Sequence, residues 1–111
     1  PGCDLPSSQD AVALAGKYPF LYAAVGFHPE NLEGASLSSL DQIRALAAHP
    51  KVKAVGEIGL DYYWLKTPKE RARSREFFEA QLWSTTATPT GTAWTLSGPT
   101  RAAAGSFTAA P

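Results

Sequence analysis

Three polar side chains stand where a predicted sheet could use them for chemistry: His28, Glu57 and Asp61. His28 follows the apolar run 21–27, while Glu57 and Asp61 close the extended run that begins at Val52. In parallel sheets the reacting groups collect at the carboxyl ends of the strands. A carboxylate held there between glycines, as Glu57 is, can bridge two hard cations in a two-metal site.

Each of these side chains also has a structural interpretation. Glu57 could face water or pair with Lys53, and His28 could be a loop histidine satisfied by the backbone. Asp61 could orient a metal ligand or cap the turn that follows it. The aromatic residues 62–64 could stack on a nucleobase, although an aromatic cluster after a strand more often packs against its neighbours. Both interpretations therefore stay open for each residue.

Alternating helical and extended patterns predict an α/β protein that could position these residues. We expect helices and strands in this order: a helix capped by Ser7 or Ser8 and ending near Gly16, a strand over 21–27, a loop over 30–36, a helix ending near His49, a strand over 52–58 and a helix beginning at Thr67. The sequence Ala-Val-Gly recurs thirty residues apart, at 24–26 and 54–56, which is about one strand-helix unit. Near-continuous apolar strands joined by helices predict a parallel sheet.

The second and third predicted helices carry clearer local signals. Leu37, Leu40, Ile43 and Ala47 share one face of the second helix. In the third helix, Thr67 fits the N-cap, Pro68 the first helical position, and Glu70 the reciprocal position of a capping box. The basic residues of this helix alternate with glutamates, which favours a solvated face over a phosphate-binding patch.

Charge divides the chain in two. Every charged side chain except Arg101 lies in residues 1–82, and residues 83–111 are dominated by Thr, Ala, Ser, Gly and Pro. Such a segment has too little apolar surface to offset the entropy of ordering it, so we expect an unstructured tail over 83–111. One explanation is a natural linker. We favour a reading-frame slip after Leu82 in a GC-rich gene.

The composition of the 111 residues excludes several classes of function. The formal net charge is zero, which argues against binding to nucleic acid or anionic lipid by bulk charge. No apolar run is long enough to span a membrane. The single cysteine, Cys3, cannot form an internal disulfide, which favours a reducing cytoplasm. We expect no membrane partner and no obligate protein partner.

Two motifs carry a resemblance to a known family. Gly26-Phe27-His28-Pro29, and the run from Val55 to Tyr63 that contains Gly-Glu-Ile-Gly-Leu-Asp, resemble signatures of the TatD family of metal-dependent deoxyribonucleases. The helix ending at Leu82 is similar to the family's next segment. The resemblance covers residues 1–82, and it implies a fragment of a TIM (β/α)8 barrel of the metal-dependent hydrolase type.

The resemblance also implies roles for the three polar residues. Glu57 matches the family's metal-ligand glutamate and would be catalytic, with Asp61 as a second catalytic residue. His28 stands where the family lines the mouth of its active site, so it would bind substrate. The implied cofactors are divalent ions (Mg²⁺, Mn²⁺ or Zn²⁺), and the implied substrate is DNA, whose phosphodiester bonds would be cleaved by a metal-activated water.

The departures from the family pattern matter as well. Family members open with a strand carrying His-x-His, and this chain begins after that point. Residues 83–111 contain no His, Asp or Glu, so the family's later ligands have no counterpart there. We therefore expect the 111-residue chain itself to be inactive. The alternatives are a related barrel metallohydrolase acting on another ester or amide, and a truncated fragment with no enzymatic role.

Overall fold

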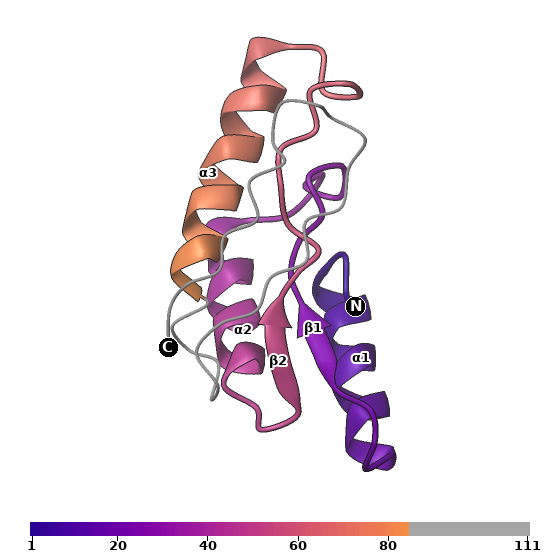
Figure 1. Ribbon diagram of the computed structural model, residues 1–111. Coiled ribbons are helices and arrows are strands. Elements are labelled where there is room, and N and C mark those ends of the chain that lie inside the picture. The colour runs from indigo at the N-terminus through magenta and orange to yellow at the C-terminus, as the bar shows by residue number, and fades with distance from the viewer. Residues whose placement is uncertain (85–111) are drawn as a thin grey trace.

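Five elements follow one another in the order that the sequence predicts (Figure 1). The computed structural model describes residues 1–84, so the predicted tail lies outside the described residues apart from Trp83 and Ser84. These two residues are helical, so the prediction of an unstructured tail from residue 83 is wrong for them. The elements are α1 (Leu5–Lys17), β1 (Ala23–Val25), α2 (Leu37–Ala47), β2 (Val52–Val55) and α3 (Pro68–Ser84). Among the described residues, the alternation of helices and strands confirms the α/β prediction.

The two strands are parallel neighbours, as predicted, and α2 connects them. Ala24 pairs with Ala54 and Val25 with Val55, and a shift of register follows Ala23. α1 lies beside β1 and α2 beside β2 (Figure 1). The parallel pairing places the segments that follow Val25 and Val55 at the same edge of the molecule.

Both strands are shorter than the apolar runs that predict them. Beyond Val25, only the amide of Gly56 continues the ladder, donating to the Val25 carbonyl at 2.9 Å. The next peptide groups, at Gly26 and Phe27, bond to side chains from α1 and α3 instead. Apolar residues therefore continue past the strand, while its regular strand-to-strand pairing stops.

The start of α1 differs from the prediction, because Asp4 and not Ser7 or Ser8 is its N-cap. The Asp4 carboxylate accepts from the Ser7 amide at 2.8 Å, and the Asp4 amide donates to the Ser7 hydroxyl at 3.1 Å. This capping box begins the helix at Leu5, with Pro6 in its first turn, where the missing N–H of proline costs nothing. Ser8 is consequently an interior residue of the helix, and it is fully buried.

The capping box predicted for α3 is confirmed. The Glu70 amide donates to the Thr67 hydroxyl at 3.1 Å, and the Thr67 amide donates back to the Glu70 carboxylate at 2.9 Å. The Thr67 amide and hydroxyl both stabilise the ionised carboxylate, so they lower the pKa of Glu70. This cap fixes where α3 begins relative to the loop that follows β2.

The core lies between the sheet and the helices. Its members are mainly aliphatic: Val25, Ile43, Ala47, Val52, Val55 and Ile58, together with Phe77 of α3. Leu40 is buried as predicted, whereas Leu37 is half exposed at the first turn of α2. No helix within residues 1–84 is both long and apolar enough to cross a membrane.

Candidate active site at the carboxyl ends of the strands

The N-terminal segment ties the backbones of His28 and Glu57 together. The amide of Glu57 donates to the carbonyl of Gly2 at 3.0 Å, and the amide of His28 donates to the carbonyl of Cys3 at 2.8 Å. Gly2 itself donates to the carbonyl of Ala24 in β1 at 2.9 Å. The structure thus brings together two of the three sequence-predicted site residues, by attaching both to successive residues of one segment.

Gly2 must be glycine for this segment to lie where it does. A Cβ atom added at Gly2 would stand 2.1 Å from the Ser8 hydroxyl oxygen and 2.5 Å from the Ser8 Cα. The second of these contacts is with backbone, which cannot rotate away as a side chain can. The close approach of Gly2 to α1 therefore depends on the absence of a side chain.

The exit from β1 is held by two buried side chains. The Ser8 hydroxyl accepts from the Gly26 amide at 3.1 Å and donates to the Gly26 carbonyl at 3.3 Å. The side-chain amide of Gln81 forms the same kind of paired contact with the backbone of Phe27. Because buried peptide groups need partners, these side chains replace a neighbouring strand immediately before His28.

The imidazole of His28 is held through one nitrogen. Its Nδ1 accepts from the Glu30 amide at 3.3 Å and lies 4.0 Å from the Glu30 carboxylate. A neutral imidazole that accepts at Nδ1 carries its proton on Nε2. His28 is therefore arranged to donate a hydrogen bond from Nε2, which suits contact with an anionic oxygen.

Glu57 has a half-buried side chain at the end of β2. Within residues 1–84 it makes no ion pair, so the predicted alternative of pairing with Lys53 is not observed. Lys53 instead lies 5.3 Å from the centre of the Tyr22 ring. An ionised carboxylate in this position retains its oxygens as potential ligands for a hard cation.

Asp61 is buried, only 4% exposed, and one of its oxygens caps the turn that follows. Its Oδ1 accepts from the amides of Tyr63 at 2.9 Å and Trp64 at 3.3 Å, and its carbonyl accepts from the Leu65 amide at 3.2 Å. The turn-capping interpretation of Asp61 is thus confirmed. A role in orienting a metal ligand stays a prediction.

The aromatic residues of this turn do not share one environment. Tyr62 is half buried, while Tyr63 and Trp64 are 58% and 61% exposed and contact each other edge to face at 4.7 Å between ring centres. The ammonium group of Lys66 lies 4.9 Å from the centre of the Tyr63 ring. Packing in the core of residues 1–84 therefore does not account for Tyr63 and Trp64.

Two arginines of α3 hold the loops that carry the site. Arg71 donates from Nε to the Leu65 carbonyl at 2.8 Å and from its terminal nitrogen to the Tyr62 carbonyl at 3.3 Å. Arg73 donates to the carbonyls of Leu32 and Ala35 in the loop after β1. The predicted solvated face is confirmed for Arg73, which is exposed, whereas Arg71 is half buried; the prediction did not include the contacts of either residue with loop carbonyls. Their spacing alone gave no signal, because the partner carbonyls belong to distant loops.

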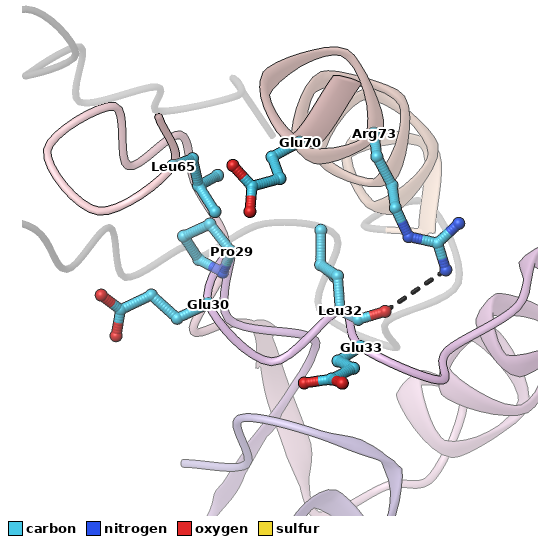
Figure 2. A pocket seen from close by; sticks show the side chains of 7 residues that line it. All are labelled: Pro29, Glu30, Leu32, Glu33, Leu65, Glu70 and Arg73. Atoms are coloured by element: carbon cyan, nitrogen blue, oxygen red, sulfur yellow. Dashed lines mark hydrogen bonds between the residues drawn. The ribbon is translucent and has the colours of Figure 1, made fainter. Parts of the chain in front are cut away.

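A cleft lies between the loop after β1 and the start of α3 (Figure 2). Its volume is about 410 Å³. The lining residues are Pro29, Glu30, Leu32, Glu33, Leu65, Glu70 and Arg73. Arg73 turns toward the Leu32 carbonyl at the edge of the cleft (Figure 2). Three glutamates with one arginine give this cleft an excess of negative charge, which opposes the entry of a phosphate group.

The donor set in the described part of the chain is incomplete for a metal. No group of three or more His, Cys, Asp or Glu side chains gathers among residues 1–84. Glu57 fits one position of a hard-cation site by its chemistry and because it has no ion-pair partner within residues 1–84. Tight sites need several convergent ligands, so residues 1–84 do not by themselves form such a site.

Comparison with known proteins identifies relatives of this chain. The family model described as TatD related DNase matches residues 1–87. YabD of Bacillus subtilis, named as an uncharacterized metal-dependent hydrolase, is 41% identical over 81 residues, which are 73% of this chain and 31% of that protein. The 3'-5' ssDNA/RNA exonuclease TatD of Salmonella typhimurium is 42% identical over 82 residues, which are 73% of this chain and 30% of that protein.

The fold comparison covers a similar share of the chain. The crystal structure of YjjV, a TatD homologue from Escherichia coli K12, matches with a TM-score of 0.66 and 36% identity, over 78% of this chain and 33% of that one. The chain thus spans about a third of the length of the relatives it matches. Its described residues form part of a TIM (β/α)8 barrel, and the chain belongs to the family of TatD-related DNases.

Proposed function

We propose that this chain is part of a metal-dependent hydrolase that cleaves phosphodiester bonds in nucleic acid. The observation that carries the proposal is the position of Glu57 and His28 after two parallel strands, with their backbone amides bonded to the successive residues Gly2 and Cys3. Family membership and the names of the relatives support the same chemistry. Because the chain spans about a third of those relatives, the activity is proposed for the complete barrel.

In this proposal Glu57 is a metal ligand and His28 binds substrate. When bound, a divalent cation (Mg²⁺, Mn²⁺ or Zn²⁺) supplies Lewis acidity toward a phosphoryl oxygen. The carboxylate of Glu57 balances part of the cation's charge. The Nε2–H of His28 donates to a non-bridging phosphate oxygen, so it orients the substrate and offsets negative charge.

Asp61 is proposed to act mainly through the turn that it caps. By holding the amides of Tyr63 and Trp64, its carboxylate fixes two exposed rings beside the strand ends. Exposed aromatic rings stack on unpaired bases with little dependence on sequence. The exposed pair therefore favours a single-stranded substrate, in agreement with the single-strand activity named for the Salmonella relative. We also propose that Asp61 makes a direct catalytic contact. Separately, we propose that the protein is cytoplasmic.

A chimaeric barrel tests this function. Residues 1–82 would replace the matching 82-residue segment of the Salmonella exonuclease, and cleavage of a single-stranded oligonucleotide would be followed with Mg²⁺ present. We expect measurable cleavage, reduced at least 100-fold by Glu57→Gln. The matched control is Glu79→Gln, which removes an exposed charge on α3 and should leave the rate unchanged. Equal rates for Glu57→Gln and the parent chimaera would overturn the assignment.

One observation favours a second candidate, a barrel metallohydrolase acting on a less anionic ester or amide. The cleft between the loop after β1 and the start of α3 is lined by Glu30, Glu33 and Glu70, and these carboxylates repel polyanions. The chimaera separates the two functions: cleavage of the oligonucleotide favours the nuclease. Hydrolysis of neutral esters that depends on Glu57, without cleavage of the oligonucleotide, favours the second candidate.

A further inference from the structure

We propose that Gln81 is a positioning residue, which fixes the direction in which His28 presents its imidazole. The inference deepens the proposed function, since His28 is its substrate-binding group. It concerns a residue on α3 that lies 53 positions after His28 in the chain. Neither the motif around His28 nor the motif around Glu57 contains it.

Gln81 forms a two-point contact with the backbone of Phe27. Its side chain is 1% exposed. Its Oε1 accepts from the Phe27 amide at 2.6 Å, and its Nε2 donates to the Phe27 carbonyl at 3.2 Å. The primary amide thus satisfies both polar groups of one residue, as a neighbouring β-strand would. The Phe27 backbone can make both bonds in one orientation only.

A second contact from the same helix holds the side chain of Phe27. The rings of Phe27 and Phe77 meet edge to face, 5.9 Å apart at 86°. Phe77 lies one turn before Gln81 on the same face of α3, and both are buried. Helix α3 therefore contacts both the ring and the backbone of Phe27.

The fixed orientation of the Phe27 backbone also determines the orientation of the His28 backbone amide. The carbonyl of Phe27 belongs to the same peptide unit as the His28 amide, which donates to the Cys3 carbonyl at 2.8 Å. Rotation of that unit would break the Gln81 contact and the Cys3 contact together. It would also displace the imidazole from the Glu30 amide, which determines that Nε2 carries the proton.

A buried side-chain amide at position 81 lowers stability unless it forms its hydrogen bonds with the Phe27 backbone. Burying an unpaired polar group lowers stability, whereas an apolar side chain of the same length would fill the space without that cost. With glutamine in place, any other orientation of the Phe27 backbone leaves buried donors and acceptors unpaired. Gln81 therefore disfavours other orientations of the Phe27 backbone, whereas packing against Phe77 alone does not.

Nuclear magnetic resonance of the ¹⁵N-labelled 111-residue chain tests the proposal. Two quantities are measured: the hydrogen-exchange rate of the Phe27 amide, and the ring ¹⁵N shifts of His28, which report its tautomer. In Gln81→Leu we expect at least tenfold faster exchange at Phe27 and a mixture of both tautomers at His28. The parent chain should show the Nε2–H tautomer alone.

Two further variants separate positioning from general stability. Phe77→Leu weakens the ring packing but keeps the amide contact, so it should lower stability and retain the Nε2–H tautomer. Gln42→Leu alters an exposed glutamine on α2 and should change neither quantity. A single Nε2–H tautomer and parental Phe27 exchange in Gln81→Leu would refute the proposal. So would a tautomer mixture in Phe77→Leu equal to that in Gln81→Leu.

Addition of Mn²⁺ distinguishes this proposal from the proposed function. The ion should broaden the amide signals around Glu57 in the chimaeric barrel that carries residues 1–82, and not in the same chimaera with Glu57→Gln. Lack of that broadening contradicts the metal-ligand role of Glu57 and leaves the tautomer result to judge Gln81. Broadening around Glu57 combined with an unchanged tautomer in Gln81→Leu contradicts the positioning role alone.

Discussion

At the scale of single residues, some polar side chains hydrogen-bond to the backbone of the fold and others keep polar atoms available for a ligand. The hydrogen bonds of Ser8, Gln81 and one oxygen of Asp61 serve neighbouring peptide groups, so these side chains build the frame. Glu57 makes no ion pair within residues 1–84, and the Nε2 of His28 is left as a donor. Uncommitted polar groups at strand ends are those that a ligand can use.

Two glycines give opposite expectations for the same substitution. A Cβ at Gly26 would stand 2.9 Å from the Ile58 Cγ2 and 3.1 Å from both the Gln81 Oε1 and the carbonyl carbon of Gly56. Gly26→Ala should therefore lower the free energy of unfolding by about 1–3 kcal/mol through overpacking. Gly16 in α1 has open space around it, so Gly16→Ala should raise that free energy by about 0.5–1 kcal/mol. Urea unfolding of the two variants measures the contrast, and equal effects would contradict it.

At the scale of elements, α3 organises the site by means that its sequence conceals. Its buried face carries Ser74, Phe77, Gln81 and Ser84, so three of the four buried residues are polar and no apolar stripe marks the face. The order of elements, the parallel pairing and the Thr67 cap follow from local patterns. The contacts of Gln81, Arg71 and Arg73 could not be predicted, because their partners are backbone groups more than five residues away.

The cap of α1 gives a pH-dependent prediction. The hydroxyl of Ser7, and then its amide, lower the pKa of Asp4 below 3.8, because both bonds favour the ionised carboxylate. Its contribution to stability is therefore complete above pH 3.8 and is lost as the pH falls through the lowered value. Asp4→Ala should cost about 1 kcal/mol at pH 7, and the cost should shrink in acid. Urea unfolding from pH 7 to pH 2 measures it, and a cost independent of pH would contradict the capping role.

The arginine contacts of α3 predict how the loop after β1 responds to a conservative change. Arg73→Lys keeps the charge but loses the planar group that reaches the carbonyls of both Leu32 and Ala35. We expect hydrogen exchange in the loop 29–36 to become about tenfold faster, which corresponds to about 1.4 kcal/mol. The control is Arg44→Lys at an exposed position of α2. Unchanged exchange in Arg73→Lys would show that the loop is held by other contacts.

At the scale of the whole molecule, the described residues form one segment of a barrel wall. Within residues 1–84 the sheet has two strands, and β2 pairs with β1 alone. A strand edge without a partner can pair with another chain. In the relatives the matched region is about a third of the chain, which accounts for a sheet of only two strands within residues 1–84.

A strand edge without a partner within residues 1–84 predicts that the chain associates with other copies of itself. Sedimentation velocity of the 111-residue chain should show a rising average mass as concentration increases. The chimaeric barrel carrying residues 1–82 should sediment independently of concentration over the same range, since neighbouring strands would cover both edges. A 111-residue chain that stays monomeric throughout would contradict the prediction.

The bond from the Glu57 amide to the Gly2 carbonyl has a consequence for the order of folding. It closes a loop of more than fifty residues, whereas the helices form from contacts only a few residues apart. Closing so long a loop has an entropic cost that must be met by contacts already in place. We therefore expect His28 and Glu57 to reach their native arrangement last, after α1 and both strands have packed. The candidate site would then form after the rest of the fold has packed, and its formation would not initiate folding.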